Sequence, residues 1–368
     1  MRARVVVIGG GIAGLSTARA LARDRDVTVL EQEAFVGTHS SARNAQIWLP
    51  VDDDPTTGPL ARASAAAWAE RLGGGWLRPR PAVVLTDAEG ARRVEAGAAA
   101  GDLSVGVLDA AARRRLAPEV EGDDVAVEVR GAGTFEPSEM IDALRRDCRD
   151  AGVRLATSTR AERVEVRAGR VAGVALEGGA RLAADEVVIA AGAYAGPLGA
   201  AVGAATTLVP LRRHLVVLEA PPTAAMVWRF TEGAEVYWRA ESGGVLASPC
   251  DEDPVAPSLP AADPSALERL AERLASVAPS LVDAPVRKTW ACLRTYARDR
   301  ELVLGLDPRV EGLAWNAGHG GRGMTVGLAA GELCARALRG EDDPMLRLMR
   351  PHRDARDVRA APEGARLG

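Results

Sequence analysis

The sequence is poor in the residues that build metal sites and disulfide scaffolds. Its 368 residues include only four cysteines and four histidines. The cysteines lie far apart without a CxxC pair, and the histidines form no HExxH motif, so we expect no metal site, redox dithiol or disulfide framework. No apolar run approaches the ~20 residues of a membrane span, and no signal-peptide core precedes the first expected strand. These absences favour a protein of the reducing cytoplasm.

The charge balance excludes a second group of functions. Lysine and arginine total 46 against 50 acidic residues, a net charge of −4, so there is no basic field for nucleic acid. Lys288 is the only lysine. The absence of GxxxxGK[ST] and GxSxG motifs argues against nucleoside triphosphatases and α/β-hydrolases. A chain that is 47% hydrophobic and 26% charged is typical of a globular protein with two domains or one large discontinuous one.

The strongest local signal is a glycine fingerprint near the N-terminus. Gly9, Gly11 and Gly14 follow a continuous apolar run in GxGxxG spacing, and Glu31 follows about 20 residues later. The expected elements are a strand over 4–8, a helix over 15–23 and a strand over 27–30. Gly9 permits a tight turn, Gly11 lets backbone approach a pyrophosphate, and Gly14 lets helix and strand pack closely. The helix N-terminus offers N–H groups to phosphate, and Glu31 can accept hydrogen bonds from ribose hydroxyls. This order of elements predicts a dinucleotide site.

Two further segments favour FAD over NAD. A polar loop over 37–45 contains Ser40, Ser41 and Arg43, whose side chains can meet phosphate or flavin oxygens. A glycine-rich turn over 318–323 precedes an expected helix to about residue 338 and can face the flavin N1–C2=O edge. A strand over 187–191 ends in small residues that allow close approach of a cofactor. Because no second GxGxxG appears, a reductase that binds both FAD and NAD(P)H is not expected.

The remaining chain alternates helical and strand-like patterns. Helices are expected over 61–72, 108–116, 138–151 and 267–277, and strands over 83–85, 153–155, 161–166, 171–176 and 302–305. The ranges 207–218 and 236–247 contain strand-like stretches. Asp109 is placed to cap the second of these helices, and Ala168-Gly169 to form a hairpin turn. The proline-rich stretch 249–264 predicts a surface loop.

Several motifs together resemble the FAD-dependent D-amino-acid oxidase/dehydrogenase superfamily. They are HSSAR over 39–43, RPRP over 78–81, TWACLR over 289–294 and GHGGRG over 318–323. The likeness runs from residue 5 to about 339 and is strongest to bacterial D-arginine dehydrogenase and to glycine and sarcosine oxidases. It implies an α/β fold, with a Rossmann-like FAD domain of discontinuous segments and a mixed-sheet substrate domain. The implied FAD segments are 1–50, 135–205 and 290–342, the substrate segments are 51–134 and 206–289, and 343–368 forms a polar tail.

The resemblance also implies site residues. Arg294, Arg213 and Tyr237 would hold a substrate carboxylate, and His319 would lie over the ring. Arg212 could be the inward-facing arginine instead of Arg213, because neighbours on a strand point to opposite faces. The implied cofactor-binding residues are Gly9, Gly11, Gly14, Glu31, Ser40, Ser41, Arg43, Val164, Ala191, Gly192, Gly320, Gly321, Gly323, Met324 and Thr325. Tyr237 could also be a core aromatic.

Departures from the family pattern limit the substrate side chains that are expected. Ala82 stands where the arginine enzyme has a glutamate, and Ile47 where it has a histidine. A buried site without an acid cannot pair a cationic side chain, so we expect a neutral or apolar substrate side chain near Ile47 and Trp48. Cys292 lies where sarcosine oxidases attach FAD covalently; the interpretations are a thioether or, favoured here, non-covalent FAD beside a buried thiol.

The resemblance implies oxidation of the Cα–N bond of a D-amino acid or N-substituted glycine, giving an imine that hydrolyses to a 2-oxo acid. The electron acceptor would be a quinone, another carrier or O2. Lys288 does not fall at the oxygen-activating lysine of sarcosine oxidases, which favours a dehydrogenase, placed at the membrane periphery if the acceptor is a quinone. Two alternatives remain: a 2-hydroxy-acid dehydrogenase of the L-2-hydroxyglutarate type, and a flavin-binding partner protein without turnover. No nucleic acid or transmembrane segment is expected.

Overall fold

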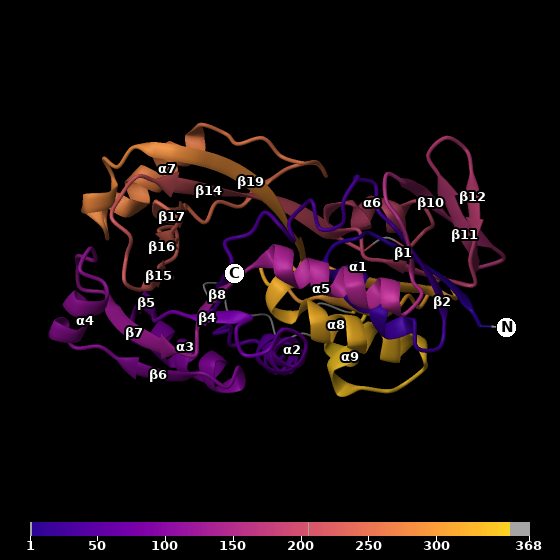
Figure 1. The fold of residues 1–368 in the computed structure, drawn as a ribbon, viewed down its shortest axis with the longest axis horizontal. Helices are drawn as coiled ribbons and strands as arrows, with labels where there is room; N and C mark the ends of the chain where they lie inside the picture. The colour runs from indigo at the N-terminus through magenta and orange to yellow at the C-terminus, as the bar shows by residue number, and fades with distance from the viewer. Residues whose placement is uncertain (1, 205, 354–368) are drawn as a thin grey trace.

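A six-stranded sheet forms the half of the molecule that contains the N-terminal strand (Figure 1). The computed structural model describes residues 2–204 and 206–353. In spatial order the sheet consists of β20 (Val303–Leu306), β21 (Leu313–Ala317), β13 (Glu186–Ile189), β1 (Arg4–Ile8), β2 (Asp26–Leu30) and β9 (Arg154–Ala156). β1 pairs in parallel with β13 and β2, and its residues Val5 to Ile8 are buried. A strand covered on both faces requires the continuous apolar run that the sequence shows.

Helices cover one face of this sheet, and a small sheet covers the other. The helices are α1 (Ile12–Leu21), α2 (Thr57–Leu72), α5 (Pro137–Asp150), α8 (Gly323–Leu338) and α9 (Pro344–Met349). α1 and α8 cross closely, since Ser16 Oγ donates to the Gly327 carbonyl at 2.7 Å and a Cβ on Gly331 would lie 2.4 Å from that hydroxyl oxygen. The small sheet is β10 (Ala161–Arg167), β11 (Arg170–Leu176) and β12 (Arg181–Ala183), with α6 (Ala195–Ala200) and the 3₁₀ helix η1 (Gly192–Tyr194) beside it.

A nine-stranded mixed sheet forms the other half of the molecule (Figure 1). Its strands, in order, are β18 (Asp253–Pro254), β14 (Leu208–Leu218), β17 (Gly244–Ser248), β16 (Val236–Glu241), β15 (Met226–Arg229), β5 (Ala82–Thr86), β7 (Val125–Arg130) and β6 (Ser104–Val107), with β19 (Val286–Ala297) paired to β14. Its accompanying helices are α3 (Ala88–Ala100), α4 (Ala110–Leu116), α7 (Ser265–Ala275) and η2 (Pro279–Leu281). A second small sheet, β3 (Ile47–Trp48), β8 (Gly133–Phe135) and β4 (Leu77–Pro79), completes the fold.

Most expected elements are present, with shifted ends. α1 begins at Ile12, three residues before the expected start, because Gly11 serves as its N-cap. Asp109 caps α4 by accepting from the Ala112 amide, and both hairpin-turn residues, Ala168 and Gly169, have positive φ, as predicted. The strand-like stretches expected within 236–247 are β16 and β17, which form a hairpin.

The sheets draw on the chain segments that the sequence assigns to two domains, but the boundaries themselves stay a prediction. The six-stranded sheet takes strands from 1–50, 135–205 and 290–342. The expected boundary at 289/290 falls inside β19, which pairs with β14 along its length. The segment expected to be a polar tail begins with α9, whose Met349 is buried, and its residues 354–368 lie outside the described part.

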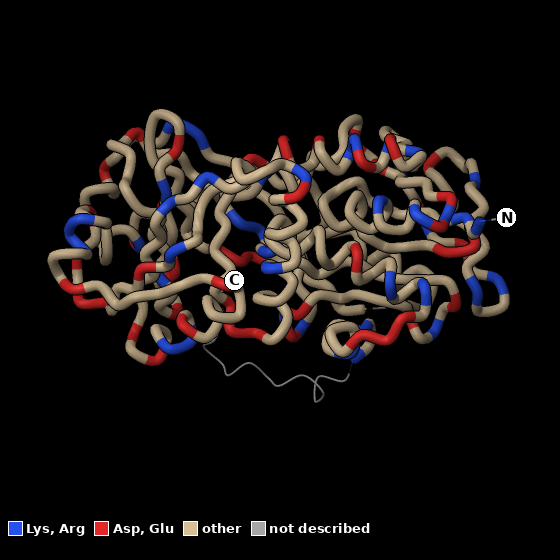
Figure 2. The backbone as a smooth tube through the Cα atoms, turned by 60° about the horizontal axis from the view of Figure 1, so that its bottom comes forward, with Lys and Arg blue, Asp and Glu red and all other residues tan. Residues whose placement is uncertain are grey.

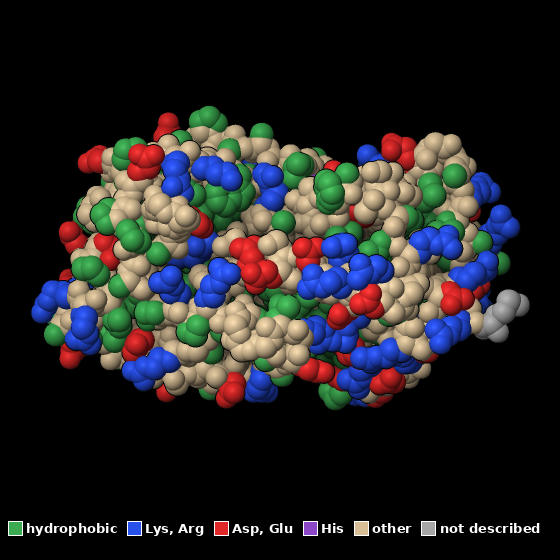
Figure 3. Space-filling model, in the orientation of Figure 1, with side chains coloured by type: hydrophobic (Ala, Val, Ile, Leu, Met, Phe, Trp, Pro, Cys, Tyr) green, Lys and Arg blue, Asp and Glu red, His purple; other side chains and the backbone are tan. Residues whose placement is uncertain are grey.

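Charges of both signs are distributed over both halves of the molecule (Figure 2). On the face shown in Figure 3, cationic and anionic side chains are interspersed. In the described part of the chain, no helix is long and apolar enough to cross a membrane.

Candidate active site

One cavity of about 400 Å³ collects most of the residues that the sequence singles out. Its lining comes from the end of β1, the start of α1, the loop after β2, segments 159–162 and 190–198, strands β14 to β16, loop 258–260, β19, and the turn before α8. The predicted residues on its wall are Gly9, Gly11, Glu31, Ser40, Ser41, Arg43, Ala191, Gly192, Tyr237, Cys292, Arg294, His319, Gly320, Gly321, Gly323, Met324 and Thr325. Folding therefore brings together residues from both ends of the sequence.

The fingerprint glycines have distinct steric roles. Gly9 has φ +113°, and a Cβ there would lie 2.4 Å from the Ala190 carbonyl oxygen. Gly11 lines the cavity, and Ser41 Oγ accepts a hydrogen bond from the Ile12 amide at 3.0 Å. Gly14 does not line the cavity; a Cβ on it would lie 1.8 Å from the Gly9 carbonyl oxygen. Its expected cofactor contact is thus indirect, because it permits the close packing of α1 on the turn.

Glu31 is held at the end of β2 by backbone amides. Its Oε2 accepts from the Gly10 amide at 2.9 Å, and its Oε1 accepts from the Glu33 amide at 2.9 Å. Each carboxylate oxygen has a second lone pair, so the group can also accept hydroxyl hydrogen bonds. A carboxylate fixed in this way suits a ribose.

The polar loop after β2 is connected to β19 as well as to the cavity. Ser40 Oγ donates to the Leu293 carbonyl at 2.5 Å, and Arg43 Nε donates to the Ala291 carbonyl at 3.1 Å. The sequence predicts these groups to meet phosphate or flavin oxygens, but they bind the backbone on both sides of Cys292. Burial raises the pKa of the Cys292 thiol, which keeps it protonated near neutral pH.

Two glycines before α8 make room for side chains behind the turn. Gly320 has φ +54°, and a Cβ on it would lie 2.1 Å from the Tyr296 ring. A Cβ on Gly321 would lie 2.9 Å from Nη1 of Arg294. The backbone of this turn therefore lines the cavity while the aromatic ring and the guanidinium pack beneath it.

A chain of hydrogen bonds through Thr17 and Asn316 orients the His319 ring and fixes which of its nitrogens carries the proton. Thr17 Oγ1 donates to the Ala13 carbonyl and accepts from Asn316 Nδ2 at 2.8 Å, so Asn316 Oδ1 faces His319 Nε2 at 2.7 Å. Nε2 must then carry the proton, and Nδ1 presents a lone pair without a partner among the described residues. Burial, reinforced by Arg322, lowers the pKa of His319 to about 4.

Of the three residues expected to bind a substrate carboxylate, two line the cavity and one does not. Arg294 and Tyr237 line the cavity, and the Tyr237 hydroxyl is buried without a hydrogen-bond partner in the described part of the chain. Arg213 does not line the cavity. Its Nε donates to the Asp251 carbonyl at 2.8 Å, and Nη2 lies 3.2 Å from Glu252, while Nη1 is buried without a partner in residues 2–204 and 206–353. A direct carboxylate contact by Arg213 thus stays a prediction.

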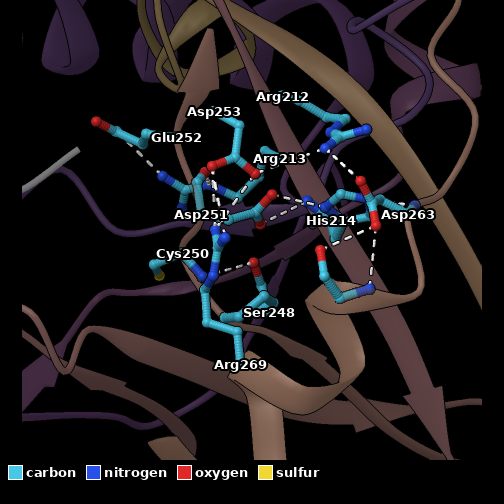
Figure 4. Close-up of polar contacts among 12 residues, drawn as sticks. Arg212, Arg213, His214, Ser248, Cys250, Asp251, Glu252, Asp253, Asp263 and Arg269 are labelled. Carbon is cyan, nitrogen blue, oxygen red and sulfur yellow. Dashed lines mark hydrogen bonds and ion pairs between the residues drawn. The ribbon is translucent and has the colours of Figure 1, made fainter.

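Arg213 belongs to a polar cluster on β14 (Figure 4). Arg212 points to the other side of the strand, where it pairs with Asp263 at 2.8 Å. His214 Nδ1 lies 2.6 Å from Asp251 Oδ2, and its Nε2 accepts from the Asp263 amide at 2.8 Å. The alternation along β14 thus gives Arg213 and Arg212 different environments, and His214 ties the proline-rich loop to the sheet.

Three other expected residues lie away from the cavity. Val164 is buried in the hydrophobic cluster between the six-stranded sheet and β10, whereas its chain neighbours 159–162 reach the cavity. Trp48 is buried and packs on Trp76 with ring centroids 4.7 Å apart, while Ile47 lines the cavity. Ala82 is in the core of the nine-stranded sheet. The period of two along a strand separates Ile47 from Trp48.

Sequence reasoning missed the aromatic wall and one acid of this cavity. Phe135, Trp228 and Phe230 line it, and the Trp228 ring lies 4.7 Å from that of Tyr237. Asp52 also lines it. None of these residues belongs to a short motif, and their positions depend on strand pairings such as β15 with β16.

Comparison with known proteins identifies the family. The sequence profile described as FAD dependent oxidoreductase matches residues 4–337. The chain belongs to this FAD-dependent oxidoreductase family. Glycine oxidase of Pseudomonas putida is 27% identical over 93% of this chain and 96% of its own length. D-amino acid dehydrogenase of Xanthobacter autotrophicus is 23% identical over 92% of this chain and 95% of its own length.

Solved structures show the same fold. L-proline dehydrogenase from P. horikoshii has a TM-score of 0.84 at 20% identity and covers 97% of this chain and 99% of its own. Glycine oxidase from Geobacillus kaustophilus has a TM-score of 0.79 at 24% identity and covers 96% of this chain and 99% of its own. The predicted family and α/β fold are confirmed.

The cavity fits the FAD that this family uses. A Cβ on Gly9 would clash with the Ala190 carbonyl, Gly11 places bare backbone on the cavity wall, the start of α1 offers amides, and the Glu31 carboxylate is fixed at the end of β2. At the other end, the turn before α8 presents backbone and the lone pair of His319. These residues would hold the dinucleotide and the ring, respectively.

Proposed function

We propose that this flavoenzyme oxidises the Cα–N bond of an amino acid with a neutral side chain and yields an imine that hydrolyses to a 2-oxo acid and ammonia. The observation that carries the proposal is Arg294, a guanidinium that is 9% exposed on the wall of the cavity beside the buried hydroxyl of Tyr237. A planar guanidinium binds a carboxylate through two parallel hydrogen bonds, which orients Cα. The names of the relatives, glycine oxidase and D-amino acid dehydrogenase, support an amino-acid substrate.

The chain contributes positioning and a dry environment. Arg294 fixes the substrate carboxylate, and the Tyr237 hydroxyl can donate a further hydrogen bond to it. Holding Cα in one orientation removes much of the entropic barrier to reaction. When bound, the flavin supplies an acceptor for the substrate hydride. Neutral His319 adds no positive charge beside the turn before α8.

The cavity wall supports a neutral or apolar substrate side chain. Ile47, Leu49, Phe135, Trp228 and Phe230 all line it. Trp228 and Phe230 stack with centroids 5.2 Å apart and present a continuous apolar surface. Such a surface favours apolar groups by about 25 cal/mol per Å² buried.

The electron acceptor we propose is a quinone or another carrier. Lys288 is exposed, lies 5.1 Å over the Trp290 ring, and is not among the residues that line the cavity. No lysine is therefore placed at the cavity to activate O2. Peroxide formed at the rate of substrate turnover would contradict this choice.

An anaerobic screen tests the proposed reaction. The purified holoenzyme is mixed with D-amino acids, N-methyl amino acids and 2-hydroxy acids, and flavin absorbance and released ammonia are followed. We expect bleaching by amino acids with stoichiometric ammonia. Bleaching only by hydroxy acids would replace the proposal with a 2-hydroxy-acid dehydrogenase, and no bleaching at all would favour a flavin-binding partner protein.

Substitution of Arg294 tests the carboxylate contact. Arg294→Lys keeps the charge but loses the two-pronged geometry, so we expect kcat/KM to fall by about 10²-fold or more. The matched control is Arg212→Lys, which alters an arginine paired with Asp263 away from the cavity. An equal fall in kcat/KM for the two variants would contradict the proposal that Arg294 binds the substrate carboxylate.

A further inference from the structure

Asp52 is held in the cavity wall by the packing of its backbone on α3. A Cβ on Gly97 would lie 2.1 Å from the Val51 carbonyl oxygen and 2.7 Å from that of Asp52. A Cβ on Gly101 would lie 2.8 Å from the Pro50 carbonyl oxygen. Close contact at both glycines fixes the segment from which the half-buried Asp52 side chain reaches the cavity.

Arg322 is the cation that interacts electrostatically with Asp52, but its guanidinium donates hydrogen bonds to other acceptors. Arg322 Nη1 donates to Asp54 Oδ2 at 2.7 Å, and Nη2 donates to the Arg300 carbonyl at 2.5 Å. Within residues 2–204 and 206–353, no side chain donates a hydrogen bond to the Asp52 carboxylate. Asp52 lines the cavity, and its carboxylate keeps acceptor capacity beyond the hydrogen bond from its own backbone.

Carboxylates outnumber cations around Arg322. Asp52, Asp54 and Glu301 all interact with this one guanidinium, and exposed Asp53 adds to the field at Asp52. Burial, together with Asp54 and Asp53 and opposed by Arg322, raises the pKa of Asp52 to about 7. Burial and Asp54 also raise the pKa of Glu301. A cation entering the cavity here would relieve this excess of negative charge.

Asp52 lines the same cavity as Arg294. Gly321 lies against the Arg294 guanidinium, since a Cβ there would be 2.9 Å from Nη1, and the next residue is Arg322. Arg294 and Asp52 thus present opposite charges to one cavity, and Arg322 interacts electrostatically with Asp52. This arrangement complements a zwitterion.

We propose that Asp52 binds the ammonium group of the amino-acid substrate and accepts one of its protons. The inference rests on the proposed amino-acid oxidation and adds a proton acceptor that the sequence did not reveal. One N–H bond of the ammonium breaks, one O–H bond forms on the carboxylate, and the substrate nitrogen keeps the electron pair. The neutral amine can then release hydride from Cα, and the carboxylic acid returns its proton to solvent after the product leaves.

The first test compares Asp52→Asn with Asp53→Asn, an adjacent exposed control with the same change of charge. Anaerobic flavin reduction by the best amino acid of the screen is measured from pH 5 to 9. We expect the wild type to show a rise in rate through about pH 7, and Asp53→Asn to keep this rise at a somewhat lower pH, because Asp53 contributes to the raised pKa of Asp52. Asp52→Asn should lose this rise and reduce the flavin 10²–10⁴-fold more slowly, as for loss of a general base.

A second test uses ligand binding rather than turnover. Acetate has a carboxylate but no ammonium group, so ionised Asp52 should repel it. Its affinity, followed by perturbation of the flavin spectrum, should fall severalfold in the wild type between pH 6 and 8 and stay constant in Asp52→Asn. If Asp52→Asn fails to fold, Asp52→Ser replaces it in the same measurement, because Glu301 near the same Arg322 also has a raised pKa and the wild type alone would not separate the two carboxylates.

The outcomes separate this inference from the proposed function. Amino acids that bleach the wild-type flavin while Asp52→Asn keeps the rise near pH 7 would overturn the role of Asp52 and leave amino-acid oxidation intact. Constant acetate affinity between pH 6 and 8 in the wild type would do the same. Failure of every amino acid to bleach the wild-type flavin would instead reject the proposed function.

Discussion

The buried pair of His214 and Asp251 allows a sharp test of how the structure is held together. The Asp251 side chain is fully buried; Oδ1 accepts from the His214 amide at 2.9 Å and Oδ2 lies 2.6 Å from His214 Nδ1. Because His214 Nε2 accepts from the Asp263 amide, Nδ1 carries the ring proton. Both carboxylate oxygens therefore face N–H donors (Figure 4).

Asp251→Asn places an NH2 group opposite one of these two donors in either amide orientation. Moving the ring proton to Nε2 gives no relief, because Nε2 would then face the Asp263 amide hydrogen. One buried donor loses its acceptor, and a charge-assisted hydrogen bond becomes neutral. We expect the free energy of unfolding to fall by about 2–4 kcal/mol.

Urea unfolding of the holoenzyme at pH 7, followed by tryptophan fluorescence, measures this loss. The matched control is Asp253→Asn, two residues away, whose side chain is 40% exposed and lies 3.6 Å from Arg212. A partly exposed pair of this kind contributes about 1 kcal/mol or less. Equal shifts in the two midpoints would refute the assignment of donors and acceptors around Asp251.

Three further outcomes are expected. Burial would raise the pKa of Asp251, but the hydrogen bonds from His214 outweigh it and lower the pKa. A carboxyl whose pKa is lowered by folding stabilises the folded protein above about pH 4 and loses this contribution as the pH falls further. The difference in unfolding free energy between wild type and Asp251→Asn should therefore narrow when urea unfolding is repeated below that pH. Gly14→Ala puts a Cβ 1.8 Å from the Gly9 carbonyl oxygen, so flavin retained on desalting should fall at least tenfold, and full retention would contradict the packing role. Because the Cys292 thiol stays protonated, the intact mass of the denatured holoenzyme should equal that of the chain alone, and an added FAD mass would demonstrate a covalent link.

The sequence predicted the geometry around Gly9 and Gly11 better than that of the cavity wall around Arg294, where we propose that the substrate binds. Gly9, Gly11 and Glu31 act within one contiguous strand–turn–helix–strand unit, so their spacing alone carries the geometry. The turn at Ala168 and Gly169 was predictable for the same reason, since its two residues set the backbone locally.

The cavity wall around Arg294 depends on pairings between distant segments. Arg213 and Arg212 could be distinguished only when the register of β14 with β19 placed Arg213 opposite Cys292. Asp52 lies in a loop without a motif, and its position comes from contacts with α3, about 45 residues further along the chain. The same long-range packing placed Val164 in the hydrophobic cluster and Trp228 at the cavity.

The scatter of the cavity lining along the chain has a consequence for biosynthesis. Residues from Ile8 to Thr325 line one cavity, and the turn before α8 is synthesised after the other segments that line it. At the usual 5–20 residues per second, a ribosome needs on the order of half a minute between these two ends. A nascent chain halted before residue 318 would carry the complete glycine fingerprint yet lack part of the cavity lining, so flavin loading should follow the synthesis of this turn, which closes the site.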